Sequence, residues 1–189
     1  MDAIETLDWG AYAHFRFQVS QYPALVPFMQ VAYYLSDYLA IGVLFSLAAM
    51  LFLLQGRHRG AQATACSLAV SLALLYGTQR LVPRLRPPDA QNWLGTSELL
   101  GSYPAASVFL FMLALTMLGF ALWNLLPNLW LRVTYLILAT ALVVWVCMCQ
   151  FILATHFVTD VIGAIAGAAL IAWLTAKFLP EPNAPSGVA

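Results

Sequence analysis

The chain has 189 residues, of which 62% are hydrophobic and only 8% are charged, and its eight basic residues balance its eight acidic ones. Because a soluble domain usually carries about 25% charged residues, this composition excludes a water-soluble globular fold. The zero net charge leaves no basic surface for nucleic acid, so no nucleic-acid partner is expected. The predicted fold class is all-α, a polytopic transmembrane helix bundle.

The first predicted element occupies residues 1–22. Ile4, Leu7, Ala11 and Phe15 recur there at helical spacing with acidic residues between them. This pattern is typical of an amphipathic helix that lies in the membrane interface. A transmembrane crossing ahead of the clear ones, which would be the sixth, is the alternative.

Five apolar stretches follow, and each is long enough for the roughly 20 residues that cross a bilayer. They lie between residues 37 and 57, 59 and 80, 99 and 131, 133 and 150, and 156 and 177. The third stretch contains a break at Asn124, Pro127 and Asn128. We therefore predict five spans in a single membrane domain over residues 1–179, with a flexible tail over 180–189.

Basic residues in short loops predict the orientation of such a bundle. With five spans, the side expected to be cytoplasmic carries Arg57, Arg59, Arg132 and Lys177. The N-terminus and the loop over residues 83–102 then lie on the other side. We expect a protein of the bacterial inner (plasma) membrane whose polar residues face the periplasm or the exterior.

His156 and Asp160 stand four residues apart at the start of the last stretch, so they share one face of a helix. The carboxylate of Asp160 can accept a proton from one imidazole nitrogen and leave the other nitrogen free as a nucleophile. Ionisable groups in a membrane span are costly and usually functional. The alternative is that both residues only meet lipid headgroups.

Two further segments lie at span ends on the same side. Arg80, Arg84 and Arg86 end the second stretch, and a guanidinium suits phosphate oxygens. Residues 102–107 open the third stretch with small side chains that leave the first backbone amides accessible to an anion. Taken singly, the arginines also fit a basic collar for anionic lipids, and the small residues fit an ordinary helix start.

The order and spacing of these three segments resemble the type-2 phosphatidic acid phosphatase family, the membrane relatives of vanadium haloperoxidases. That family carries the motifs K-x6-RP, PSGH and SR-x5-H-x3-D. The matching segments here run from Gln79 to Pro87, from Pro104 to Ser107, and from Cys149 to Asp160. The resemblance implies that His156 is the nucleophile that becomes phosphohistidine and that Asp160 orients it.

The departures from these motifs matter as much as the matches. Ser107 stands where the family has the histidine that protonates the leaving group, and Gln79 and Gln150 stand where it has a lysine and an arginine that bind phosphate. Only Arg86 remains at a motif cation position. The predicted phosphate-binding residues are therefore Arg86, Arg80, Ser107, Gln79 and Gln150, with Arg80 as the substitute for the missing lysine.

The size of these losses determines the functional prediction. A general acid contributes roughly 10²–10⁴ in rate, and each lost transition-state charge contact costs a similar order. We expect a catalytically degenerate lipid-phosphate-phosphatase-like protein that binds a lipid or polyprenyl phosphate headgroup or acts as a scaffold in a membrane complex. The alternatives are an active lipid phosphatase that works through His156 and a purely structural membrane subunit. Expected partners are membrane lipids and proteins of such a complex, and neither a metal nor another cofactor is expected.

Overall fold

The computed structural model describes residues 3–88 and 101–179. Within these ranges the chain forms helices joined by turns and short loops. They are α1 (Ala3–Gln21), α2 (Leu25–Leu35), α3 (Tyr38–Leu54), α4 (His58–Leu81), α6 (Ala106–Leu122), α7 (Leu129–Ile152) and α8 (Val158–Phe178). The tail predicted over residues 180–189 lies outside the described residues.

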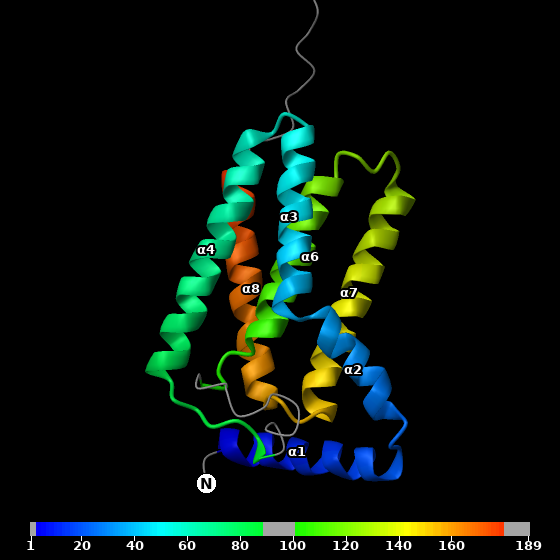
Figure 1. Cartoon of the computed structure of the whole chain (residues 1–189), viewed down its shortest axis with the longest axis vertical. Coiled ribbons are helices and arrows are strands. Elements are labelled where there is room, and N and C mark those ends of the chain that lie inside the picture. Colours follow the sequence, from blue (N-terminus) through cyan, green and yellow to red (C-terminus); the bar gives the residue numbers. More distant parts are fainter. Residues whose placement is uncertain (1–2, 89–100, 180–189) are drawn as a thin grey trace, which may run out of the picture.

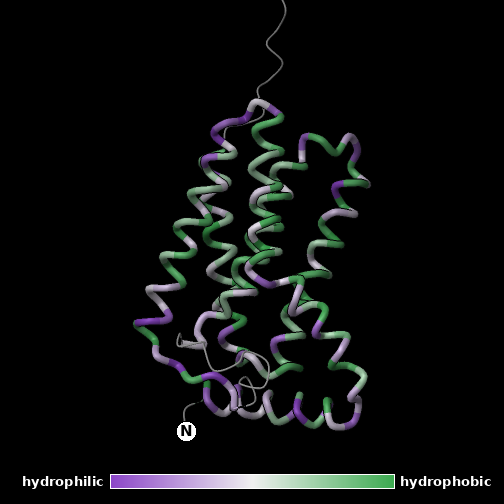
Figure 2. The backbone as a smooth tube through the Cα atoms, in the orientation of Figure 1, coloured by the Kyte–Doolittle hydropathy of each residue, from purple (hydrophilic) through white to green (hydrophobic). Residues whose placement is uncertain are grey.

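The long helices run side by side, whereas α1 lies across one end of the bundle (Figure 1). Hydrophobic residues follow the long helices, and hydrophilic residues gather in the turns and on α1 (Figure 2). The α3–α4 turn, the α6–α7 connection and the C-terminal end of α8 all lie at the end opposite to α1. This arrangement is that of an integral membrane protein with two polar ends.

The helices by themselves establish fewer membrane spans than the apolar stretches predict. By length and composition, α4, α7 and α8 each suffice to cross a membrane. Helices α2 and α3 pass the same test together, as a pair bent by 46°, and α6 is a shorter apolar helix. The predicted count of five is therefore not confirmed, although a helix lies in each of the five apolar stretches.

Helix α6 forms the centre of the bundle and packs against α3, α4, α7 and α8. Its side chains are buried around almost the whole helix circumference. A helix that is apolar on every side is buried, because no face of it gains from contact with water. The central helix therefore holds the other helices at fixed positions around the site.

Local signals explain where the helices end. The predicted break after the third stretch is confirmed, since α6 ends at Leu122 and the side chain of Asn128 caps α7 by accepting the Leu131 amide at 2.9 Å. Gly56 ends α3 with φ of 70°, a left-handed conformation that costs glycine little. Helix α7 begins a few residues earlier than its apolar stretch, so Arg132 lies in its first turn.

Helix α8 approaches α6 closely at two glycines. A Cβ atom at Gly163 would come within 2.5 Å of the Tyr103 ring, and one at Gly167 would come as close to the ring of Phe109. The absence of side chains at these positions lets the helices pack tightly. The start of α8 is thereby held against the loop before α6, where the Ala105 amide donates to the backbone carbonyl of Asp160 at 3.1 Å.

Candidate functional site

The turn between α7 and α8 determines where His156 lies. Thr155 N–H donates to the carbonyl of Gln150 at 2.9 Å, and Ala154 N–H donates to that of Phe151 at 3.1 Å. These two bonds form a Schellman motif, in which the left-handed residue is usually glycine. Here that residue is Ala154, with φ of 54°. The backbone accepts about 1 kcal/mol of strain in a turn that presents Thr155 and His156 to the bundle end.

A second pair of segments meets the turn from the opposite side. The Ser102 amide donates to the carbonyl of Arg84 at 2.8 Å, which joins the chain after α4 to the chain before α6. A Cβ atom at Gly101 would lie 2.9 Å from the carbonyl oxygen of Gln79. The Gln79 side chain is buried and donates to the carbonyl of Pro104 at 3.4 Å. These contacts place the Ser102 side chain beside the His156 ring.

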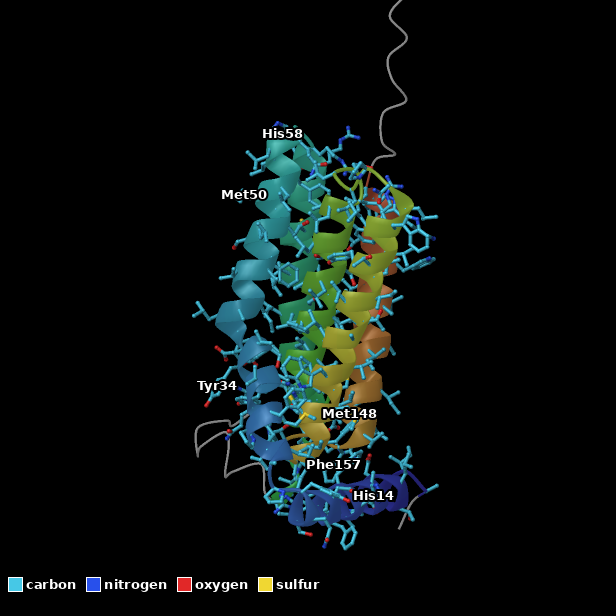
Figure 3. All side chains as sticks on the ribbon, turned by 90° about the vertical axis from the view of Figure 1, so that its right-hand side faces the viewer. His14, Tyr34, Met50, His58, Met148 and Phe157 are labelled. Atoms are coloured by element: carbon cyan, nitrogen blue, oxygen red, sulfur yellow. The ribbon has the colours of Figure 1, made fainter. Side chains whose placement is uncertain are left out.

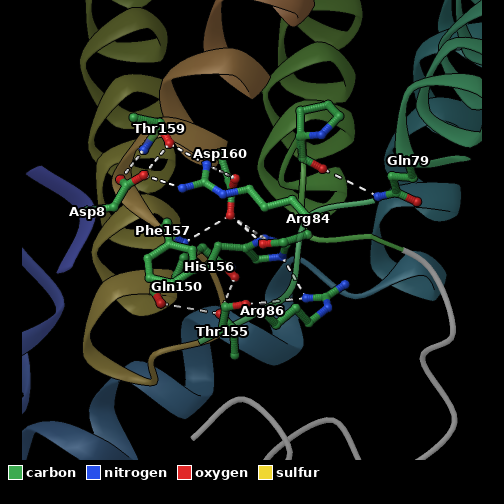
Figure 4. A network of polar contacts seen from close by, with 12 residues as sticks. Asp8, Gln79, Arg84, Arg86, Gln150, Thr155, His156, Phe157, Thr159 and Asp160 are labelled. Carbon is green, nitrogen blue, oxygen red and sulfur yellow. Dashed lines mark hydrogen bonds and ion pairs between the residues drawn. The ribbon is translucent and has the colours of Figure 1, made fainter. Parts of the chain in front are cut away.

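One nitrogen of the His156 ring faces two buried acceptors (Figure 4). Its Nδ1 lies 3.3 Å from Ser102 Oγ and 3.7 Å from Asp160 Oδ2. The Ser102 hydroxyl donates in turn to Asp160 Oδ2, which also accepts the Phe157 amide at 3.0 Å. Since 3.7 Å is too long for a good hydrogen bond, Asp160 orients the ring mainly through Ser102.

The other nitrogen faces a cation, and this fixes the tautomer of the ring. Arg86 Nη1 lies 3.0 Å from His156 Nε2. A guanidinium can only donate, so Nε2 accepts and the ring proton lies on Nδ1. Burial also lowers the pKa of His156 below its usual value. The ring is therefore neutral at pH 7 and has its unprotonated nitrogen beside Arg86.

Arg84 joins the site to α1. Its guanidinium forms ion pairs with the carboxylates of Asp160, at 2.8 Å, and of Asp8. Asp8 is fully buried and also accepts the amide of Thr159 at 3.1 Å and its hydroxyl at 2.7 Å. The guanidinium lies over the Phe157 ring, which Figure 3 shows where α1 meets the bundle. This network ties the N-terminal helix to the first turn of α8.

A pocket opens on the Nε2 side of the ring. Four predicted site residues converge on it, namely Arg86, Ser107, Gln150 and His156. The junction between α2 and α3 supplies another part of the lining. The remaining residues that line it are Tyr33, Ser36, Asp37, Tyr38, Ala106 and Thr155.

The other predicted residues lie elsewhere. Asp160 is completely buried behind the ring, and Gln79 holds the Pro104 carbonyl instead of lining the pocket. Arg80 is exposed and lies over the ring of Tyr76 at 5.2 Å, so the structure does not bring it to the pocket as a substitute for the missing lysine. Within the pocket wall, Gln150 is committed to a 2.6 Å hydrogen bond from the Thr155 hydroxyl.

Sequence reasoning missed several of the residues that build the site. The sequence indicates Asp8 only as an acidic residue of an amphipathic pattern and Ser102 only as part of a small-residue segment. It indicates Arg84 as a group for phosphate or anionic lipid, not as a partner of buried carboxylates, and Asp37 only as a span boundary. The arginine cluster was a usable signal for Arg84, because three cations on the side opposite to the positive-inside expectation need acidic partners. Nothing local connects Asp8 with that cluster.

Comparison with known proteins supports a PAP2-type membrane fold. No protein-family model and no curated protein matches the chain. Among solved structures, the chain is similar to the crystal structure of a transmembrane PAP2 type phosphatidylglycerolphosphate phosphatase from Bacillus subtilis. The TM-score is 0.79 over 94% of this chain and 87% of that one, at 20% sequence identity. The resemblance predicted from the three motifs is thus confirmed in the fold.

Proposed function

We propose that this membrane protein binds the phosphate of a lipid headgroup in the pocket beside His156 and hydrolyses it slowly or not at all. One observation carries the proposal. Among the described residues that line the pocket, Arg86 is the only arginine or lysine. Ser107 and Gln150 share the pocket wall, but both are neutral.

The placement of Arg86 supports phosphate binding. Its Nη1 is 3.0 Å from His156 Nε2, so a phosphorus atom in front of that nitrogen would have an oxygen within reach of the guanidinium. A guanidinium–phosphate contact is a strong, charge-assisted one. A transferring phosphoryl group, however, develops charge on several oxygens at once. A single cation therefore supports binding better than it supports turnover.

The hydrogen bonds that orient the His156 ring favour a second candidate function, an active lipid phosphatase. Ser102 and Asp160 hold the ring in the tautomer that a nucleophile needs. In such a reaction Nε2 would attack phosphorus while the bond to the lipid oxygen breaks, and water would then hydrolyse the phosphohistidine. The leaving oxygen must take up a proton, and the residue at the motif position is Ser107. Because a serine hydroxyl has a high pKa, it is a poor acid at neutral pH.

The distribution of basic residues supports a location for the pocket relative to the membrane. His156 lies in the α7–α8 turn near α1, whereas the opposite end of the bundle contains the α3–α4 turn, the start of α7 and the end of α8. These elements carry Arg57, Arg59, Arg132 and Lys177. The positive-inside rule supports a cytoplasmic position for that basic end and a periplasmic or exterior position for the pocket, in a bacterial inner membrane crossed five times. A scaffold role would appear as a protein that remains bound during purification in mild detergent.

Phosphate release tests the proposal. Purified wild type and His156→Ala should release phosphate from phosphatidate and from polyprenyl phosphate at similarly low rates. Binding of the same lipids should fall in Arg86→Gln. Fast release by wild type that disappears in His156→Ala would replace the proposal with the active phosphatase.

A further inference from the structure

The pocket has a second wall with chemistry opposite to that of Arg86. The junction between α2 and α3 contributes Tyr33, Asp37 and Tyr38 to the lining. Figure 1 shows this junction as the bend between α2 and α3, beside α7. A carboxylate and two phenol rings are the groups that proteins use to hold an ammonium ion. They are not groups that hold phosphate.

The carboxylate of Asp37 is available for such a partner. Asp37 precedes α3 as its N-cap, and its carboxylate accepts a long hydrogen bond of 3.4 Å from the Leu39 amide. The residue is exposed. Among residues 3–88 and 101–179, no arginine, lysine or histidine forms an ion pair with it. A negative charge therefore faces the same pocket as the positive charge of Arg86.

The charges that line the pocket favour a phosphodiester with an attached ammonium group over a phosphomonoester. Among the described residues that line the pocket, Arg86 contributes one positive charge, Asp37 contributes one negative charge, and the His156 ring is neutral. A phosphomonoester carries a charge of about −1.5 to −2 at pH 7, so it would meet a wall with no net charge and a carboxylate that repels it. A phosphodiester joined to an ammonium group has one charge of each sign and matches both walls.

We propose that the pocket takes a zwitterionic phospholipid headgroup, with its phosphodiester against Arg86 and its ammonium group against Asp37, Tyr33 and Tyr38. This inference rests on the proposed binding of a lipid phosphate at Arg86 and specifies the class of lipid. It also accounts for the neutral residues at the motif positions. A singly charged phosphodiester needs one cation, and a bound headgroup that is not cleaved needs no proton donor.

Competition between lipids in native mass spectrometry tests the inference. The protein in mild detergent receives equal amounts of phosphatidylethanolamine, phosphatidylglycerol and phosphatidate with identical acyl chains. Wild type should retain phosphatidylethanolamine over both anionic lipids. Asp37→Asn should lower that preference about fivefold, the size expected of one exposed ion pair. Asparagine also caps helices well, so the fold should persist. Asp37→Glu should keep most of the preference.

Two further variants separate the inference from the function on which it rests. Glu5→Gln removes an exposed carboxylate on α1, outside the pocket, and should behave like wild type. Arg86→Gln should lose all three lipids. If wild type prefers phosphatidate, or if Asp37→Asn leaves the ratio of the lipids unchanged, the zwitterion assignment is wrong while phosphate binding stands. If Arg86→Gln binds every lipid like wild type, the proposed function itself fails.

Discussion

The two nitrogens of the His156 ring face two differently built regions. Behind Nδ1, Ser102, Asp160, Arg84 and Asp8 form a continuous network in which each carboxylate has several donors. In front of Nε2, Arg86 shares the pocket with the uncharged Ser107 and Gln150. Under the proposed function, the half of the site that orients His156 is complete, whereas the half that would bind phosphate is reduced to one cation among the described lining residues. The buried network also joins α1 to the first turn of α8 and to the chain after α4.

Restoring the reduced half should give the largest effect. Ser107→His with Gln150→Arg returns a proton donor and a second cation to the pocket wall. Phosphate release from phosphatidate should rise by roughly 10²-fold or more, because each group alone is worth about that much. Adding His156→Ala to the same background should abolish the gain. No increase in a folded double variant would show that the reduced half differs in backbone position as well as in side chains.

Breaking the complete half should cost stability. Arg84→Met leaves the buried carboxylates of Asp8 and Asp160 without their shared cation. Loss of one partner from a buried ion pair typically costs about 3–5 kcal/mol, which unfolding in detergent can measure. The matched control, Arg80→Met, removes an exposed cation and should change the free energy of unfolding by less than about 0.5 kcal/mol. Similar losses in both variants would contradict the network.

The two serines of the site offer a smaller contrast. Ser102→Ala removes the hydroxyl between His156 and Asp160 and should cost about 1–3 kcal/mol, because it leaves buried polar atoms without a partner. Ser107→Ala should be nearly neutral for stability. Nitrogen NMR shifts of the His156 ring should indicate one tautomer in wild type and in Ser107→Ala. A ring that keeps one tautomer without Ser102 would show that the Arg86 contact at Nε2 fixes the tautomer without help from this hydroxyl.

The smallest expected effect is a dependence of stability on pH. Burial lowers the pKa of His156 in the folded protein, whereas an unfolded histidine titrates near 6.5, about its ordinary value. The unfolded state therefore takes up a proton first as the pH falls, and the free energy of unfolding should decrease below about pH 6.5. His156→Gln should show a shallower decrease between pH 7 and 5. Equal slopes in wild type and His156→Gln would show that His156 is not the source of the pH dependence.

The sequence predicts the parts of this molecule that depend on local patterns. The apolar stretches place the long helices, and Asn128 with Pro127 marks the break before α7 because a cap and a missing amide act within one turn. The spacing of His156 and Asp160 likewise places both at the start of α8. Three motif segments were enough to indicate the fold. Four residues at or beside these motif positions, Arg86, Ser107, Gln150 and His156, line one pocket.

The rest depends on distant contacts that no local pattern encodes. Arg80 and Arg84 look equivalent in the sequence, yet one lies over Tyr76 and the other between two buried carboxylates. Gln79 occupies a motif position but bonds to a backbone carbonyl, because the loop before α6 passes directly beside it. The pocket wall from the α2–α3 junction was not predicted, since no motif residue lies there. The chain path, more than residue type, decides these roles.

The bonds of Asp8 have a consequence for the order of assembly. Asp8 is 76 residues from Arg84 and 151 residues from Thr159 along the chain, and it bonds to both. A chain synthesised from its N-terminus has the first of these groups early and the last only after the start of α8 has emerged. Non-local contacts of this kind are slow to form, because loop closure costs entropy before the contact is made. The network around Asp160 and the docking of α1 therefore cannot be complete until the first turn of α8 has joined the bundle.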